Sequence, residues 1–452
     1  MMRPGEARVP EPGVQEILKA DGEQQPPSHT TVSNIKVPNR PVAFERYTSQ
    51  SFFDLEMERM WPRTWQWACR EEHIPSPGDY YVYDVGRNSL IVVRTDRGGI
   101  KAYYNACLHR GTKLKPSSSE GTTKELRCPY HGWGWSLDGD LVRQPCAWDF
   151  KHLNAQDLKL PEARVGVWGG FVFVNMDPDA IPLETYLSPL PEFAKGLEER
   201  YVALHVQKEL NCNWKIASEA FVESYHVQET HPQLMVGNGH TGQYDVFNDH
   251  VNRIFVPSAV ASSHFKERPS QQELLDAMAL GDRTALAGKL TVPEGSTARK
   301  VMAQHFRDMA GGSVTNLSTT EIIDTLNYSI FPNAQFFPSV TFPLIYRFRP
   351  LDMSPHRTLF DLLLLYVVPK NAMRPPPAQP VRIAHDQSYT TVPGIDPTFG
   401  HIFDQDTGNM AWMHEGMLAS KRKAAVSADY QEVRIRHMHQ TLDKYLARPP
   451  TE

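Results

Sequence analysis

The sequence predicts a two-domain α+β protein. It comprises an N-terminal segment at residues 1–44, a small antiparallel β domain at 45–178, and a larger domain of helices and antiparallel strands at 179–452. The chain of 452 residues exceeds what a single hydrophobic core usually supports. Short β-branched and aromatic runs dominate between Cys69 and Val174, and helical spacings mix with strands after that point.

Composition and charge argue against several classes of protein. The net charge of −5 argues against nucleic acid as an obligate partner. The longest apolar run, Leu362–Val368, is too short to span a bilayer, and no signal segment is visible near the start, so we expect no membrane association. Five cysteines, an odd and sparse set, do not form a disulfide framework, which favours a reducing, cytoplasmic location.

The first half of the chain is predicted to be mainly β. Residues 1–44 are rich in proline and are expected to be extended or partly disordered, apart from a short helix at Val14–Ala20. A helix is expected at Tyr47–Arg59. Short β-branched and aromatic runs bounded by turn residues at Asp79–Tyr104 predict an antiparallel meander, and Phe171–Val174 predicts another strand.

The second half mixes helices with strands. Strands are expected within 327–368, and Asp177–Asp179 is expected to begin the linker that precedes this half. Spacing and composition predict helices at Leu187–Leu197, Trp214–Glu229, Gln271–Leu290, Ala298–Met309 and Asn409–Ala447.

Four metal-ligand candidates lie close together in the β domain: Cys107, His109, Cys128 and His131. Two thiolates and two imidazoles suit either a tetrahedral zinc ion or a Rieske 2Fe–2S cluster, in which two histidines bind one iron. In a zinc finger the cysteines form one close pair and the histidines another. Here each pair is mixed, which gives each loop one sulfur and one nitrogen and favours the cluster.

The glycines beside these candidates strengthen the interpretation. Gly111 and Gly132 are expected to let the backbone approach the cluster and to donate N–H groups to sulfur. The two stretches, CLHRGTKL and CPYHGWGWSLDG, resemble the Rieske fingerprint of the ring-hydroxylating oxygenase family.

A second metal site is predicted near His226 and His231. Five residues apart, the two imidazoles diverge on an ideal helix, so both bind one ion only if the helix loosens or ends between them, as Pro232 allows. A carboxylate from elsewhere would complete a facial triad on Fe(II) with positions open for dioxygen. The residues alone leave that carboxylate open.

The resemblance supplies a candidate. The segment from Asn213 through His231 is similar to the family's mononuclear iron helix, and the family's third ligand is an aspartate ahead of a late helix. Asp406 falls at that position, with Asp404 as the alternative. In the family an acidic residue at the place of Glu223 bridges the cluster of one subunit to the iron of the next.

Three further features concern roles around the iron. Tyr225 is a candidate for a hydrogen bond near the metal, or for a core residue. Ala220 stands where many members of the family have Asn, so any role of that amide is lost here. The substrate pocket is expected to be lined by Phe221, by residues from 232–326, and by strands around Phe336, Phe342 and Phe360.

The resemblance implies a terminal oxygenase α component with a Rieske domain and a helix-grip catalytic domain, holding a 2Fe–2S cluster and a mononuclear Fe(II). It implies a homotrimer or an α3β3 assembly that most often cis-dihydroxylates an apolar aromatic or polycyclic ring with O2. No flavin or NAD motif is visible, so a ferredoxin or flavoprotein reductase is the expected electron donor. The alternatives are a Rieske monooxygenase or oxidative demethylase, or an iron–sulfur electron carrier without enzymatic activity.

Overall fold

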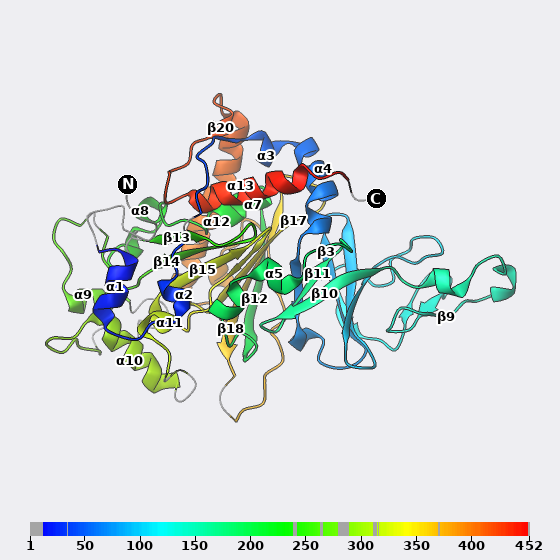
Figure 1. Ribbon diagram of the computed structural model, residues 1–452, viewed down its shortest axis with the longest axis horizontal. Coiled ribbons are helices and arrows are strands. Elements are labelled where there is room, and N and C mark those ends of the chain that lie inside the picture. The colour runs from blue at the N-terminus through cyan, green and yellow to red at the C-terminus, as the bar shows by residue number, and fades with distance from the viewer. Residues whose placement is uncertain are drawn as a thin grey trace.

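Two large sheets, one in each half of the chain, organise the fold of this computed structural model (Figure 1). The structure describes residues 12–33, 35–237, 242–262, 265–278, 289–310, 314, 316–368 and 371–450. Within these residues no helix combines the length and apolar character needed to cross a membrane.

The first sheet confirms the predicted meander. Its strand order over the described residues is β2-β11-β10-β5-β4-β3-β6, and each neighbouring pair is antiparallel. The bounds are β2 (Gln66–Arg70), β3 (Asp79–Val85), β4 (Asn88–Arg94), β5 (Ile100–Tyr104), β6 (Glu120–Thr122), β10 (Glu162–Trp168) and β11 (Phe171–Asn175). A small sheet beyond it contains β7 (Leu126–Arg127), β8 (Gly134–Trp135) and β9 (Leu141–Arg143).

The second sheet crosses the middle of the molecule. Its order over the described residues is β13-β14-β15-β16-β17-β18-β12-β19, antiparallel except for the last pair. The bounds are β12 (Arg200–Leu210), β13 (Gln243–Val246), β14 (Val251–Val256), β15 (Thr325–Ile330), β16 (Ala334–Phe336), β17 (Leu344–Pro350), β18 (Thr358–Val367) and β19 (Val381–Ile383). Strands β1 (Val42–Ala43) and β20 (Ala424–Ala425) form a separate pair.

The central sheet is covered on both faces, as alternation along β17 shows. Ile345 packs into a cluster that contains Trp67 and Phe171 of the first sheet. Its neighbours Leu344 and Tyr346 face the opposite cluster, which is formed with α7 and α12. Because side chains alternate along a strand, one sheet both docks the β domain and supports the helices of the catalytic side.

The helices confirm some predictions and correct others. Their bounds are α1 (Val14–Asp21), α2 (Pro27–Thr30), α3 (Glu45–Thr48), α4 (Gln50–Arg59), α5 (Leu183–Leu187), α6 (Leu190–Phe193), α7 (Trp214–Glu219), α8 (Val227–Thr230), α9 (Gln271–Ala277), α10 (Ala298–Ala310), α11 (Thr319–Ile323), α12 (Pro397–Ala419) and α13 (Val433–Leu446). The helix expected at Leu187–Leu197 is confirmed only over the single turn of α6, because the chain breaks after α5 and restarts at Pro189, with Pro191 in the first turn of α6. The helix expected at Gln271–Leu290 ends as α9, and residues 279–288 lie outside the described part.

The described part of the N-terminal segment is more ordered than expected. Helix α1 confirms the predicted short helix, and its Val14 and Leu18 are buried in the core cluster on one face of the central sheet. Asp21 at its end pairs with Arg299 of α10 at 2.7 Å, and Arg299 also binds Asp324 at 2.6 Å. The contacts of the apolar face of α1 and this buried ion pair stabilise an ordered conformation, although the proline-rich composition predicts an extended or partly disordered segment.

A buried charge cluster joins the two large sheets. Arg347 of β17 and Asp361 of β18 form an ion pair at 3.0 Å, with both side chains inaccessible to solvent. Arg349 approaches the same carboxylate at 3.1 Å. Arg347 also donates to the carbonyls of Trp67 and Ala68 in β2, at 3.0 and 2.8 Å. The cluster therefore ties the β domain to the strand that supports the catalytic side.

Candidate metal centres

The four ligand candidates of the first centre lie on two loops of the same shape. Cys107 and His109 follow β5, and Cys128 and His131 connect β7 with β8. In both loops the cysteine N–H donates to the carbonyl five residues later, at 2.8 Å. The spacing in the sequence therefore folds locally into two matching hairpin loops.

The glycines in these loops act differently from the prediction. Gly111 and Gly132 both have φ of +76°, a left-handed conformation that favours glycine. Their N–H groups close the turns by donating to the cysteine carbonyls, at 2.8 and 3.2 Å, and are not available to sulfur. The N–H groups of Tyr130 and His131 donate to the Cys128 sulfur instead. Burial acts to raise the pKa of this thiol, but these donors contribute to a net lowering.

The paired geometry fits a two-iron cluster better than one zinc ion. The rings of His109 and His131 lie 4.6 Å apart, and the two thiols lie within hydrogen-bonding reach of each other. Among the described residues, no three of these four candidates form a group that could hold a single metal ion. Two sulfurs for one iron and two nitrogens for the other is the arrangement of a Rieske centre.

One buried ring nitrogen of His109, Nδ1, has no hydrogen-bond partner among the described residues. Trp133 stacks on the ring at 5.2 Å and 8°, which holds its orientation. Buried polar atoms are normally paired, so this nitrogen fits a metal ligand.

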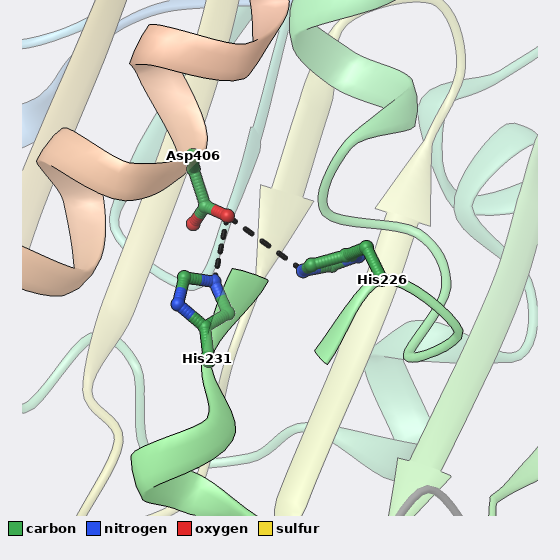
Figure 2. A group of neighbouring side chains, drawn as sticks. All are labelled: His226, His231 and Asp406. Atoms are coloured by element: carbon green, nitrogen blue, oxygen red, sulfur yellow. Dashed lines mark hydrogen bonds and ion pairs between the residues drawn. The ribbon is translucent and has the colours of Figure 1, made fainter. Parts of the chain in front are cut away.

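The second centre brings together three residues from two distant segments (Figure 2). His226 and His231 flank the single turn of α8, and Asp406 lies on α12. Asp406 Oδ1 is 2.7 Å from His231 Nε2 and 3.6 Å from His226 Nε2. Their ligand atoms all lie within 4.8 Å of one another, the one such group among the described residues. Two imidazoles and one carboxylate match the donor set of a facial triad for non-haem iron.

The local fold explains how residues five apart converge. The helix expected at Trp214–Glu229 ends at Glu219, and the chain turns before α8 begins. His226 is the N-cap of α8 and His231 is its C-cap, with φ of −129°. The helix therefore loosens before the first histidine and ends at the second.

Two neighbours orient the imidazoles. Glu223 Oε1 lies 2.7 Å from His226 Nδ1, and Gln405 Oε1 lies 2.9 Å from His231 Nδ1. Both oxygens accept hydrogen bonds, so each ring carries its proton on Nδ1 and turns Nε2 toward Asp406. Burial lowers the pKa of His226, but Glu223 and Asp406 outweigh this effect and the net pKa is raised. Gln405 was not among the sequence candidates.

The structure separates the two aspartates on α12. Asp404 accepts a hydrogen bond from the Tyr389 N–H at 3.0 Å and another from the Ser388 hydroxyl. It also lies 3.6 Å from Lys208 Nζ. Its carboxylate is thus occupied on the other side of the helix from the histidines, whereas Asp406 points at them.

A cavity of about 250 Å³ reaches the second centre. His226, Asp406 and Glu223 line one part of it. The remaining lining is mostly apolar and is drawn from the central sheet, α9, α12 and the segment after α7: Phe221, Val227, Leu234, Ile254, Val256, Ala277, Met278, Phe337, Phe342, Leu344, Tyr346, Phe399, Ile402 and Phe403. A mostly apolar space beside a candidate metal triad suits an apolar substrate.

The expected pocket is partly correct. Phe221, Phe342 and residues within 232–326 line it, but Phe336 and Phe360 lie in core clusters. Phe337, one residue along from Phe336, faces the cavity instead, because adjacent positions of an extended chain point in opposite directions. Tyr225 is 55% exposed and is not among the lining residues, so it is neither a core tyrosine nor a supported candidate for catalysis.

The contribution of α12 was missed from the sequence. The helix begins at Pro397, well before the predicted start at Asn409, and Asp406 lies inside it. Asp396 followed by proline is an N-terminal signal, and its side chain accepts the Phe399 N–H at 3.0 Å. The spacing of Phe399, Phe403 and Asp406 marks one helical face.

Two family models match the chain. One, described as the ring hydroxylating alpha subunit (catalytic domain), matches residues 197–448. The other, described as the Rieske [2Fe-2S] domain, matches residues 64–154. Together they include every candidate ligand named above.

Curated relatives match over part of their length. Benzene 1,2-dioxygenase subunit alpha from Pseudomonas putida is 34% identical over 192 residues, which are 41% of this chain and 42% of that protein. Glycine betaine monooxygenase oxygenase subunit from Chromohalobacter salexigens is 34% identical over 193 residues, 42% of each chain. The alignments span about two fifths of these relatives.

Solved structures share the fold over most of the chain. Naphthalene 1,2-dioxygenase with indole in its active site has a TM-score of 0.65 at 19% identity, covering 92% of this chain and 94% of that one. A quaternary ammonium Rieske monooxygenase has a TM-score of 0.62 at 16% identity, covering 91% of this chain and 96% of that one.

Proposed function

The chain belongs to the family of ring-hydroxylating oxygenase alpha subunits, an enzyme family with a Rieske 2Fe–2S cluster and a mononuclear iron. On that premise we propose that it is the terminal oxygenase that adds oxygen from O2 to an apolar aromatic or polycyclic ring, with cis-dihydroxylation as the reaction. The observation that carries the proposal is the apolar, aromatic-lined cavity that opens onto His226 and Asp406.

The proposed iron ligands are His226, His231 and Asp406, and the proposed cluster ligands are Cys107, His109, Cys128 and His131. When bound, the two groups supply single electrons and an iron with open positions for dioxygen.

The surrounding residues hold this site in order. Glu223 and Gln405 orient the two imidazole rings through Nδ1. The Nε2 atoms of both histidines therefore face Oδ1 of Asp406. Phe221 and Phe403 exclude water from the space beside it and provide flat surfaces for a ring. The protein thereby confines an apolar substrate next to the metal.

Electrons are proposed to come from a ferredoxin or a flavoprotein reductase, and to pass between neighbouring copies in a homotrimer or α3β3 assembly. In Figure 1 the small sheet with β9 lies at one end of the molecule's long axis, and α8 lies toward the other end. This separation supports transfer from the cluster of one copy to the iron of the next. His131 and Tyr130 are exposed at the cluster, and Glu223 lies beside the iron site, in keeping with a bridging role.

Monooxygenation or oxidative demethylation is the second candidate, because one relative is named a glycine betaine monooxygenase. A betaine carries a carboxylate, yet the described lining of the cavity contains no Lys or Arg to bind it. An apolar ring is therefore favoured over a zwitterion.

Labelled dioxygen tests the proposal. The purified protein, reconstituted with a ferredoxin and a reductase, is expected to convert members of a panel of aromatic and polycyclic rings to products that contain two ¹⁸O atoms in one diol. One labelled atom in each product would assign monooxygenation instead. A failure to oxidise any ring by a protein that holds both metal centres would contradict the proposal.

A further inference from the structure

One side chain in the cavity combines deep burial with an unused polar atom. Tyr346 of β17 is 3% exposed and lines the cavity. The rings of Phe221, Phe337 and Phe403 lie 4.9, 4.9 and 5.9 Å from its ring. Across the described residues nothing forms a hydrogen bond with its hydroxyl, although Asp406 and Tyr389 lie near enough to interact with it electrostatically.

The other polar side chains in the lining are occupied or reach solvent. Asn327 donates to a backbone carbonyl and a side-chain amide, at 2.8 and 2.9 Å. Ser224 Oγ lies 2.9 Å from a tyrosine hydroxyl, and Ser258 donates to a carbonyl at 2.6 Å. Thr325 and Thr398 are only half-buried. Tyr346 is therefore the deeply buried donor that remains for a ligand.

The location of Tyr346 determines what its hydroxyl can bind. A tyrosine hydroxyl carries its proton at neutral pH, so Tyr346, which lines the cavity, can donate a hydrogen bond to a ligand there. Tyr389 provides an internal comparison. Its hydroxyl also lacks a partner within the described structure, but that atom is sealed from solvent and the residue does not line the cavity.

We propose that the Tyr346 hydroxyl donates a hydrogen bond to an oxygen of the substrate. The substrate class is then an apolar ring that bears one neutral carbonyl or hydroxyl group, and the inference rests on the proposed oxygenase function. The acceptor is neutral because the described lining contains no Lys or Arg to bind an anion, and the one imidazole in it, His226, is a proposed metal ligand. With a volume of about 250 Å³, the cavity is smaller than the roughly 300–1,000 Å³ typical of drug-sized ligand sites, which suits a ligand of a few fused rings.

The test compares indane with 1-indanone, two bicyclic molecules that differ by one carbonyl oxygen. Isothermal titration calorimetry on the metal-loaded wild type is expected to give about fivefold tighter binding of 1-indanone, the usual net effect of one hydrogen bond. Tyr346→Phe is expected to bring the ratio of the two Kd values close to one by weakening the binding of 1-indanone. Tyr389→Phe removes an equivalent hydroxyl outside the cavity and is expected to keep the wild-type ratio.

Equal Kd values in the wild type, or an unchanged ratio in Tyr346→Phe, would overturn the inference. Loss of mononuclear iron in Tyr346→Phe would also overturn it, because the hydroxyl would then position Asp406. Product analysis separates the two proposals. Preferential binding of 1-indanone without oxidation of any ring would contradict the proposed function alone, whereas oxidation of both molecules with equal Kd values would contradict only the role of Tyr346.

Discussion

Replacing Asp406 with Asn is expected to remove the mononuclear iron and leave the cluster in place. Asp406 Oδ1 lies 2.7 Å from His231 Nε2 and 3.6 Å from His226 Nε2, and it supplies the only negative charge of the three. Asn keeps the shape and loses that charge. Changes to residues that merely orient a ligand weaken metal binding by about 10- to 100-fold. Loss of the charged ligand is therefore expected to cost at least about 100-fold, or ~2.7 kcal/mol.

Asp404→Asn is the matched control, because it makes the same change two residues earlier on the same helix. Asp404 accepts hydrogen bonds from Tyr389 and Ser388 and lies 3.6 Å from Lys208 Nζ. The control is expected to lower the free energy of unfolding by about 1–3 kcal/mol through these lost contacts. It is expected to retain the iron.

The assay is metal and sulfide content after anaerobic reconstitution. A 2Fe–2S cluster contributes equal iron and acid-labile sulfide, so iron in excess of sulfide reports the second centre. The excess is expected to vanish in Asp406→Asn, with cluster absorbance unchanged, and to persist in Asp404→Asn. Excess iron and turnover in Asp406→Asn, or their loss in Asp404→Asn alone, would refute the assignment.

Three further predictions concern stability. Burial raises the pKa of Glu219 from 4.5 to about 8, so the folded state holds a proton that the unfolded state releases between these two pH values. The free energy of unfolding therefore falls as the pH rises from 4.5 to about 8. Glu219→Gln should make the urea midpoint depend less on pH over this range, and an unchanged dependence would contradict the prediction. Asp361→Asn leaves the buried Arg347 without its carboxylate and should lower the free energy of unfolding by about 3–5 kcal/mol, whereas a change under 1 kcal/mol in denaturant titrations would argue against the pairing. Asp21→Asn weakens the bond to Arg299 and should cost about 1–3 kcal/mol and speed proteolysis near α1, and an unchanged cleavage rate would contradict the docking of that helix.

The cluster loops were predictable because their geometry is local. Each loop closes through hydrogen bonds between residues four or five apart, so the spacing of Cys107, His109, Cys128 and His131 was enough to indicate the chemistry. The use of the glycine N–H groups was not predictable. Which N–H group reaches a sulfur depends on the backbone conformation of the turn. In these turns the glycine N–H groups donate to the cysteine carbonyls.

The mononuclear centre depended on contacts between distant segments. The sequence offered Asp404 and Asp406 equally well as residue types, and residues two apart on a helix project in nearly opposite directions. Only the packing of α12 decided which one faces His231.

By itself, then, the sequence indicated two domains, the candidate cluster ligands and the histidine pair, because these depend on local spacing, short strand patterns and residue chemistry. The tertiary structure distinguished Asp406 from Asp404 as the candidate third ligand, placed Phe337 and not Phe336 in the cavity wall, and left the hydroxyl of Tyr346 without a partner among the described residues. These features depend on helix rotation and strand register. Both are set by long-range packing, which a local sequence pattern does not specify.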